Sequence, residues 1–371
     1  MKVLIVSVSF YPEVSPRSFR TTELAKEFRR QGHEVTLAGR DREGSADVIN
    51  EYGIRYVSCG NASWEGVSQW MISKGGFWRI VQGVMGWFLE FPSIEWLFVI
   101  PKRLKIAEEF DLIISIAVPY PVHWGVNRAI KKGNIKGKTW VADCSDPFMF
   151  DVLRARKIPF YFSIFEKAFC RRANFLTVPM EAAKDGYYPE FRSKMRIIPQ
   201  GFHFEKEREN LPEYIKNEVP TFVYAGAFMP NGRDPRALIG YLKSKQEDFR
   251  FYMYTHQKYL VEPLLDAGDK RFILKDIVPR TEIMGIMRRS DFLINIMNST
   301  PMQLPSKLID YYIIDRPVLN LDSDTLSEKD KRNIDLFFVG EYGNRLIFGE
   351  MLQYHIREVV KEFTALMLEN K

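Results

Sequence analysis

Short apolar runs alternate with amphipathic segments along most of this 371-residue chain. In the first half the apolar runs have the length of strands, and the segments between them have helical periodicity. The strand-like runs are residues 3–8, 34–38, 111–116, 139–143 and 175–178, and the helix-like segments are 18–31, 122–132 and 160–172. Gly32 follows the first helical segment as a helix-ending glycine does. The alternation predicts βα units and hence an α/β fold with a doubly wound parallel sheet.

The same pattern starts again in the second half of the chain. Its strand-like runs are residues 221–225, 249–254, 272–274 and 292–296, and its clearest helical segment is 235–245. A polar stretch at 204–219, rich in Glu, Lys and Asn, separates the two series and has the composition of a linker. Because the chain exceeds the length that one core usually supports, we expect two domains, 1–210 and 211–349. An apolar stripe in the last helical stretch, at about 350–371, needs a surface to dock on.

Composition places the chain among globular proteins. It has 46% hydrophobic and 27% charged residues and a formal net charge of +6. The basic residues are scattered and not interleaved with aromatics, so we expect no nucleic-acid partner. Three widely separated cysteines, Cys59, Cys144 and Cys170, lack metal or disulfide spacing and favour a reduced compartment. The short N-terminal apolar run lacks the features of a secretion signal, and the apolar stretch 84–100 is interrupted by charges.

Residues 300–317 form the most informative segment. They follow a buried-looking strand and open a helix with proline near its first position, so free backbone N–H groups point out of the carboxyl end of the sheet. Such a helix start can bind an anion. Lys307 adds a positive charge there, and Asp310, one turn later, is placed to accept hydrogen bonds from ribose hydroxyls. The alternative is a solvated helix start with a Lys307–Asp310 ion pair.

This segment, PSKLIDY at 305–311 followed by RPVL at 316–319, resembles the donor-site helix of family 4-like glycosyltransferases with the GT-B fold. Other similar pieces occur in the family's order along nearly the whole chain. They are FYPE at 10–13 with Arg20, GHEVT at 32–36, IIPQG at 197–201, VYAG at 223–226 with Arg233, and RSDFLIN at 289–295. The resemblance implies two Rossmann-like domains facing a central cleft, an acceptor-binding N-terminal domain and a donor-binding C-terminal one, with the last helix returning to the first domain.

The resemblance further implies that a nucleotide-diphosphate sugar binds in the second domain. The expected donor residues are Arg233, Ser306, Lys307, Asp310, Pro305 and Gln303. Because the diphosphate gains negative charge as the sugar bond breaks, cationic side chains can stabilise it without a metal. We therefore expect neither a metal nor a cofactor. A solvated loop cation is the alternative for Arg233. Met302 stands where many family members carry a sugar-reading glutamate, so the sugar and the stereochemical outcome are not implied.

Two carboxylates, Asp143 and Asp146, follow a predicted strand of the first domain. The sequence DCSDP at 143–147 is similar to an Asp-x-x-Asp-Pro pattern in a subset of the family. A carboxylate at this edge of the sheet can take the proton of an acceptor hydroxyl. Asp146 is our first candidate for the base and Asp143 the second, although Asp146 alternatively caps a turn. The expected acceptor-side residues are Arg17, Arg20 and His123, and a cap or packing role is the alternative for His123.

Residues 64–105 contain five of the seven tryptophans, together with several Lys and Arg. Aromatic side chains beside cations are typical of a membrane interface. In the resembling family this part of the N-terminal domain often faces the membrane or a lipid-linked acceptor, so we expect it to form the acceptor face on the inner leaflet. The alternative is a set of core helices packed on the sheet.

The sequence thus predicts a cytoplasmic glycosyltransferase, peripheral on the inner face of the cell membrane. It would move a sugar from a nucleotide-diphosphate sugar to a hydroxyl of a lipid-linked glycan in the biosynthesis of capsule, O-antigen or exopolysaccharide. A sugar-nucleotide epimerase of similar fold and a non-catalytic glycan- or nucleotide-binding subunit are the alternatives. A Rossmann oxidoreductase is disfavoured because no Gly-x-Gly-x-x-Gly follows the first strand.

Overall fold

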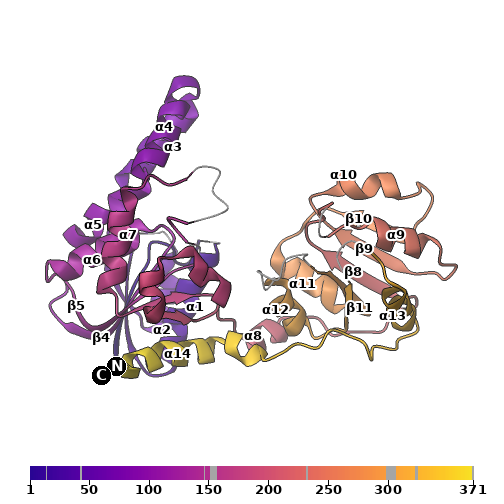
Figure 1. The fold of residues 1–371 in the computed structure, drawn as a ribbon. Helices are drawn as coiled ribbons and strands as arrows, with labels where there is room; N and C mark the ends of the chain where they lie inside the picture. Colours follow the sequence, from indigo (N-terminus) through magenta and orange to yellow (C-terminus); the bar gives the residue numbers. More distant parts are fainter. Residues whose placement is uncertain are drawn as a thin grey trace. The chain divides into compact units, whose positions relative to one another are not determined.

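The computed structural model describes residues 1–13, 15–41, 44–145, 147–150, 157–230, 233–297, 306–321 and 325–369. The chain divides into two compact units, drawn in Figure 1. Unit 1 comprises Met1–Phe202 and Leu352–Lys371, and unit 2 comprises His203–Met351. The division lies at 202/203, whereas the sequence pattern placed the domain boundary at 210/211.

Unit 1 is built on a seven-stranded parallel sheet in the order β3-β2-β1-β4-β5-β6-β7. The strands are β1 (Lys2–Val6), β2 (Glu34–Gly39), β3 (Arg55–Ser58), β4 (Glu109–Ile116), β5 (Lys136–Asp143), β6 (Phe175–Val178) and β7 (Met195–Ile197). The α-helices are α1 (Pro16–Arg30), α2 (Ser45–Tyr52), α3 (Ser63–Lys74), α4 (Gly76–Leu89), α5 (Trp96–Arg103), α6 (Pro121–Lys131), α7 (Phe162–Arg172) and α14 (Ile356–Glu369). The strand order reverses between β1 and β4, the place where such sheets bind ligands.

The last helix, α14, belongs to unit 1 and packs beside α1. Its apolar stripe is buried together with residues of β1, β4 and α1 in one core, which covers one face of the sheet. The buried members of the stripe are Ile356, Val359, Val360, Phe363 and Leu366. The chain thus crosses from unit 1 to unit 2 and returns, so two connections join the units.

Unit 2 holds a five-stranded parallel sheet in the order β10-β9-β8-β11-β12. Its strands are β8 (Thr221–Ala225), β9 (Arg250–Tyr254), β10 (Phe272–Lys275), β11 (Phe292–Ile296) and β12 (Val318–Leu321). Its α-helices are α8 (Phe204–Glu209), α9 (Arg236–Lys243), α10 (Lys258–Val261), α11 (Arg280–Arg288), α12 (Ser306–Ile314) and α13 (Glu328–Phe338). Here the order reverses between β8 and β11. The two sheets confirm the predicted α/β class with doubly wound parallel sheets.

The polar stretch 204–219, predicted as a linker, is part of unit 2. It begins with α8, and its later residues are bound to the sheet by side-chain contacts. The Asp291 carboxylate accepts a hydrogen bond from the Tyr214 hydroxyl at 2.7 Å and another from the Thr221 backbone N–H at 2.8 Å. The Arg316 guanidinium lies 3.3 Å from the centroid of the Tyr214 ring. Composition alone does not reveal such contacts, because they join residues far apart in the sequence.

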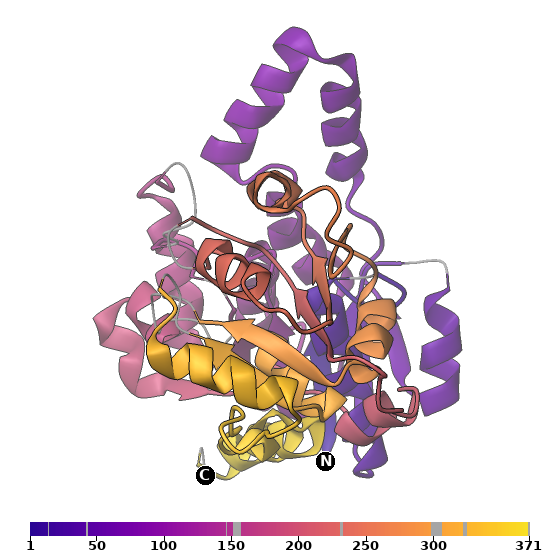
Figure 2. The same ribbon diagram turned by 90° about the vertical axis from the view of Figure 1, so that its right-hand side faces the viewer.

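Helices α3 and α4 form a hairpin that projects from the body of unit 1 (Figures 1 and 2). Among the described residues, no single helix is long and apolar enough to span a membrane. The helix α4 taken together with residues 93–103 has sufficient length and apolar composition, but the two parts are bent by 44° relative to each other. The second part includes α5, whose Trp96, Leu97 and Ile100 are buried in the core of unit 1.

Candidate functional site

The carboxyl ends of β8 and β11 place Gly226 beside Lys307 in unit 2. Gly226 directly follows β8, and Lys307 lies in the first turn of α12, the helix after β11. The Lys307 amine is 4.5 Å from the centroid of the Tyr224 ring. A Cβ at Gly226 would collide with that amine, and the positive φ of +148° at this residue also favours glycine. The missing side chain at position 226 therefore makes room for the Lys307 amine at the point where the strand order reverses.

Two cationic side chains share this place. Burial lowers the pKa of Lys307 to about 7, and the nearby Arg233 guanidinium lowers it as well. Neither Lys307 nor Arg233 forms an ion pair with a carboxylate among the residues that the structure describes. The buried Nε of Arg233 also has no hydrogen-bond partner within that part of the chain. Two close, partly desolvated cations repel each other, so an anion that binds between them relieves an unfavourable charge arrangement.

Asp310 is paired with Arg280, not with Lys307. Its Oδ1 accepts from Nη2 of Arg280 at 2.7 Å and from Nε at 3.1 Å. Arg280 also donates to Glu207 of α8 at 3.0 Å. Burial raises the pKa of Asp310, while the Arg280 guanidinium opposes the rise. The Lys307–Asp310 ion pair considered from the sequence does not form. The ribose contact of Asp310 stays a prediction, and Arg280 holds its carboxylate in place.

Some predicted residues fall outside the described part of the chain. These are Asp146, the first candidate for the base, and Gln303 and Pro305 on the donor side, together with Met302. The backbone of Ser306 begins α12, but its side chain is not described. The assignments of these residues therefore stay predictions.

Arg20 and Asp143 form a buried ion pair in unit 1. Arg20 Nη2 lies 2.9 Å from Oδ1 of Asp143 and Nε lies 3.0 Å from Oδ2, so both carboxylate oxygens are engaged. The Thr177 hydroxyl donates to Oδ1 at 2.7 Å. Arg20 also donates to the carbonyls of Ile198 and Pro199, in the turn that leads toward unit 2. Arg20 therefore ties α1 to β5 and to that turn, which leaves it no surface for an acceptor, contrary to the sequence expectation.

The Arg20–Asp143 ion pair affects how well Asp143 can act as the base. Burial raises the pKa of Asp143, but the adjacent Arg20 guanidinium and the Thr177 hydroxyl outweigh it, so the net shift is downward. A lowered pKa makes the carboxylate a weaker proton acceptor. Asp143 as the base stays a prediction, and its occupied oxygens favour a structural role. Arg17, half-buried in the first turn of α1, also contributes to the lowered pKa of Asp143 and remains a candidate on the acceptor side.

His123 is a core residue. It is fully buried in α6, with Nδ1 2.8 Å from the Ser115 hydroxyl and Nε2 3.7 Å from the Cys144 sulfur. Burial lowers its pKa to about 3, so the ring is neutral at physiological pH. This geometry replaces the acceptor-side expectation with the packing role, because a side chain without solvent contact cannot reach an acceptor.

Sequence reasoning missed a buried acid, Glu166 of α7. Burial raises its pKa to about 7. An acidic residue on an amphipathic helix is normally assigned to the solvent face, so no sequence signal marked it. Sequence reasoning also missed Tyr224 and Arg280, which position Lys307 and Asp310. Tyr224 lies inside the VYAG strand that was singled out, whereas the Arg280 contact spans 30 residues of sequence.

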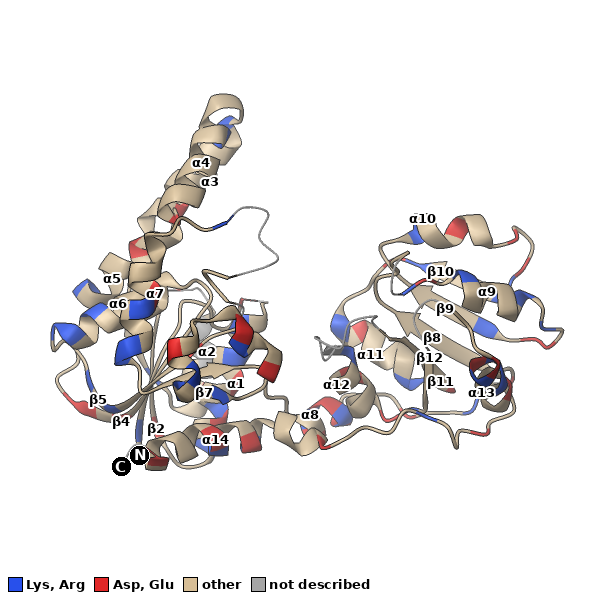
Figure 3. Ribbon diagram, in the orientation of Figure 1, with Lys and Arg blue, Asp and Glu red and all other residues tan. Residues whose placement is uncertain are grey.

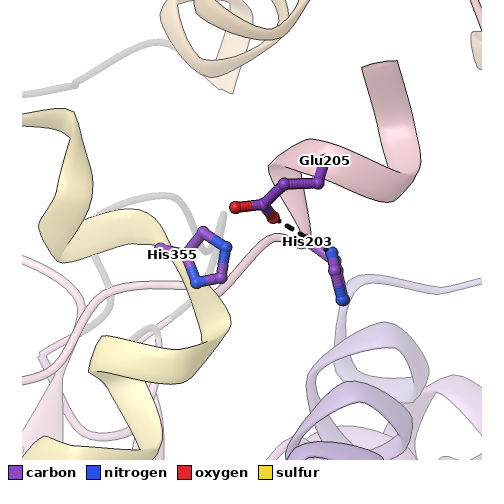
Figure 4. Close-up of side chains that lie close together, drawn as sticks. All are labelled: His203, Glu205 and His355. Carbon is purple, nitrogen blue, oxygen red and sulfur yellow. Dashed lines mark ion pairs between the residues drawn. The ribbon is translucent and has the colours of Figure 1, made fainter. Parts of the chain in front are cut away.

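Figure 4 draws His203, Glu205 and His355. His203 and Glu205 begin unit 2, and His203 Nδ1 lies 3.3 Å from the Glu205 carboxylate. His355 belongs to unit 1, where its Nδ1 accepts a hydrogen bond from the backbone N–H of Arg357 at 3.1 Å. Because the three residues are divided between the two units, they support no metal assignment.

No protein-family model matches this sequence, and no curated protein matches it. Solved structures do match over the whole fold. A glycosyltransferase from Rickettsia africae aligns with a TM-score of 0.56 at 13% identity, over 100% of this chain and 96% of its own. The lipopolysaccharide outer core galactosyltransferase WaaB aligns at 0.52 and 11% identity, over 100% of this chain and 98% of its own.

A trehalose-6-phosphate synthase also aligns, with a TM-score of 0.52 at 12% identity, over 99% of this chain and 95% of its own. At these identities the comparison concerns the fold alone. The chain has the two-domain Rossmann-like GT-B fold, as the sequence resemblance implied.

Proposed function

We propose that this protein is a glycosyltransferase that takes a sugar from a nucleotide-diphosphate sugar bound by unit 2. The observation that carries the proposal is the pair of cations, Lys307 and Arg233, at the reversal point of the unit 2 sheet, with no carboxylate partner among the described residues. A diphosphate has the charge to bind at such a place, next to a helix N-terminus that also favours anions. The fold shared with solved glycosyltransferases supports the same assignment.

The chemistry follows from charge. When the bond between the sugar and the diphosphate breaks, negative charge develops on the leaving diphosphate, and nearby fixed cations stabilise that charge. With a pKa of about 7, the Lys307 amine is partly neutral near neutral pH and becomes more fully protonated as the anion binds, so the site gains positive charge when it is occupied. Under this proposal the cations act in place of a metal ion. Asp310, held by Arg280, accepts hydrogen bonds from the ribose.

A second part of the proposal concerns the acceptor. We infer that the acceptor is a hydroxyl of a lipid-linked glycan in surface polysaccharide biosynthesis, bound by unit 1 on the cytoplasmic side of the membrane. What supports it is the sequence resemblance and the aromatic, cation-bearing region 64–105 of unit 1. Asp146 remains our first candidate for the base that takes the acceptor proton.

Product analysis tests this function. The protein is incubated with UDP-glucose, UDP-galactose, GDP-mannose or ADP-glucose, with and without a lipid-linked glycan fraction from membranes. We expect nucleoside diphosphate and glycosylated lipid to form together, and only when the lipid fraction is present. An epimerised nucleotide sugar formed from donor alone would replace the transferase by an epimerase. Binding of a donor with no turnover under any condition would favour the non-catalytic binding subunit.

A variant separates binding from chemistry in the same assay. Asp146→Asn should retain donor affinity and lose transfer, because only the proton acceptor is removed. Asp143→Asn is the matched comparison, and unchanged transfer per folded molecule in both variants would show that neither carboxylate is the base.

A further inference from the structure

The α3–α4 hairpin of unit 1 exposes apolar side chains that the body of unit 1 does not cover. No residue of α4 is buried, although most of the helix is apolar. Phe77 is 70% exposed and Ile80 66% exposed. Trp70 and Trp78 pack against each other across the hairpin, with ring centroids 5.2 Å apart, and each remains more than two-fifths exposed. A helix that is apolar around most of its surface is expected to pack against an apolar partner and not to remain in contact with water.

The base of the hairpin is fixed to unit 1 by specific contacts. The buried Glu95 carboxylate accepts hydrogen bonds from the backbone N–H groups of Ser63 and Trp64, at 3.1 and 2.7 Å, and so caps the first turn of α3. Arg40 forms a two-bond pair with Glu65, at 2.8 and 2.9 Å. These contacts fix the base of the hairpin, so the exposed apolar surface belongs to an ordered part of unit 1.

The turn between the two helices is made by Gly75 and Gly76, with positive φ values of 65° and 47°. Two glycines allow a tight reversal that other residues adopt at a cost. The 14 residues of α4 span about 21 Å at 1.5 Å per residue. That length is less than the hydrocarbon core of a bilayer, which is about 30 Å thick. The hairpin thus has the dimensions to enter one leaflet and not to cross both.

Beyond Glu65 at its base, the charges of the hairpin have one sign. From residue 66 to residue 89 the charged side chains are Lys74 and Arg79, and no acidic residue occurs. Both are exposed and lie on either side of the glycine turn. Figure 3 shows the hairpin almost without charge along its length. Apolar and tryptophan side chains next to isolated cations match an anionic lipid surface, in which the rings enter the interface and the cations meet the headgroups.

An apolar groove of about 510 Å³ lies at the base of the hairpin. Its walls come from α3, α4, α5 with the segment before it, and α7, and they include Val67, Leu89, Phe98 and Phe165. A hydrocarbon chain fits a groove with this lining, because there are few polar groups to desolvate.

We propose that the α3–α4 hairpin and its basal groove form a lipid-binding surface: the tip enters the interface of one leaflet of an anionic bilayer, and the groove takes a hydrocarbon chain of a membrane lipid. This inference rests on the proposed function in one respect, because it assigns the lipid part of the lipid-linked acceptor to unit 1. The membrane contact itself does not require transferase activity.

The test measures binding to vesicles of phosphatidylcholine with and without phosphatidylglycerol by flotation. The wild-type chain should float with the anionic vesicles and less with the neutral ones. Phe77→Ser with Ile80→Ser should weaken binding by about tenfold or more, because two apolar side chains are removed from the inserted tip. The matched control is Val339→Ser with Ile347→Ser, two residues of unit 2 that are 73% and 84% exposed, and it should bind as the wild type does.

A fluorescent label locates the contact and the groove. The native cysteines Cys59, Cys144 and Cys170 are buried, so a cysteine introduced at exposed Ser73 can be labelled selectively with an environment-sensitive dye. Its emission should shift to the blue on anionic vesicles, whereas a label at exposed Ser193 of unit 1 should not shift. Val67→Trp, which fills the groove, should lower transfer to the lipid-linked acceptor and leave tip insertion unchanged.

The experiments distinguish failure of this inference from failure of the proposed function. Equal vesicle binding by the tip variant and the wild type, or no blue shift at Ser73, would overturn the inference. Concentration-dependent self-association that the tip variant abolishes would overturn it in favour of a second copy of the chain as the cover. Failure of the proposed function appears elsewhere, as loss of nucleotide-sugar binding or turnover in a wild-type protein that still binds vesicles.

Discussion

Binding of a nucleotide sugar should draw a proton onto Lys307. With a pKa of about 7 in the free protein, about nine-tenths of the Lys307 amines are neutral at about pH 8, and about one-tenth at about pH 6. A bound diphosphate favours the charged amine and raises its pKa well above 8. We therefore expect the uptake of about 0.9 proton per bound ligand at about pH 8 and about 0.1 at about pH 6.

The same linkage fixes how affinity depends on pH. A group whose pKa is low in the free state and high in the complex makes binding weaker as the pH rises through the free-state value. From about pH 6 to about pH 9, the protonated fraction of Lys307 falls about 90-fold, which corresponds to about 2.7 kcal/mol of binding free energy.

Titration calorimetry in HEPES and in Tris measures the proton uptake, because the two buffers differ in ionisation enthalpy. A nucleotide sugar is the suitable ligand, since both ends of its diphosphate are esterified and it does not titrate near neutral pH. Lys307→Arg is the matched control: it keeps the charge, does not titrate, and should show no proton uptake and a flat affinity from pH 6 to pH 9. Tight binding by the wild type without proton uptake at pH 8, or the same uptake by Lys307→Arg, would refute the reasoning.

Three further predictions concern residues around the two sheets. Gly226→Ala places a Cβ against the Lys307 amine and strains a positive-φ residue, so calorimetry should show nucleotide-sugar affinity reduced about tenfold or more, and the cost in stability should be about 1–3 kcal/mol; unchanged affinity would contradict the geometry. Arg20→Ala leaves the Asp143 carboxylate buried without its partner, which should cost about 3–5 kcal/mol in urea denaturation, and a loss below about 1 kcal/mol would contradict this account. The folded-state pKa of Glu166 is raised from 4.5 to about 7 by burial, so stability should fall by up to about 3 kcal/mol as pH rises from 4.5 to 7; Glu166→Gln should remove that fall, and identical pH profiles would contradict it.

Most strands of the two sheets could be predicted because they are marked by local composition. The strands β8, β9, β10 and β11 of unit 2 appear in the sequence as apolar runs, and the structure places each within one residue of its predicted limits, whereas β12 was not predicted as a strand. The polar stretch 204–219 was harder to interpret. Its attachment to unit 2 depends on Asp291, more than 70 residues away, and composition carries no record of such pairing.

The arrangement of the two cations in unit 2 could be predicted only in part. The positions of Lys307 and Arg233 follow from their motifs, but their mutual proximity and the role of Gly226 depend on where two strands end in space. The role of His123 could not be predicted for a different reason. A histidine at a helix start has the same local signature whether it faces a ligand or the core, and only the packing around α6 decides between them.

The aromatic region 64–105 divides in the structure. Trp96 of α5 is buried in the core, as the alternative interpretation held, whereas Phe77 and Ile80 of α4 are largely exposed. Both parts are rich in apolar and aromatic side chains, and the difference arises from whether a neighbouring helix is available to cover each face.

The central claim is that Lys307 and Arg233 bind the diphosphate of a nucleotide sugar, and thermal melting tests it most directly. Wild type and the double variant Arg233→Ala, Lys307→Ala are each heated with UDP-glucose, UDP-galactose, GDP-mannose and ADP-glucose. A specific ligand at about 100 times its dissociation constant stabilises a protein by about 2.7 kcal/mol. We predict that one of these nucleotide sugars raises the melting temperature of the wild type and leaves that of the double variant unchanged. An equal rise in both proteins would contradict the claim.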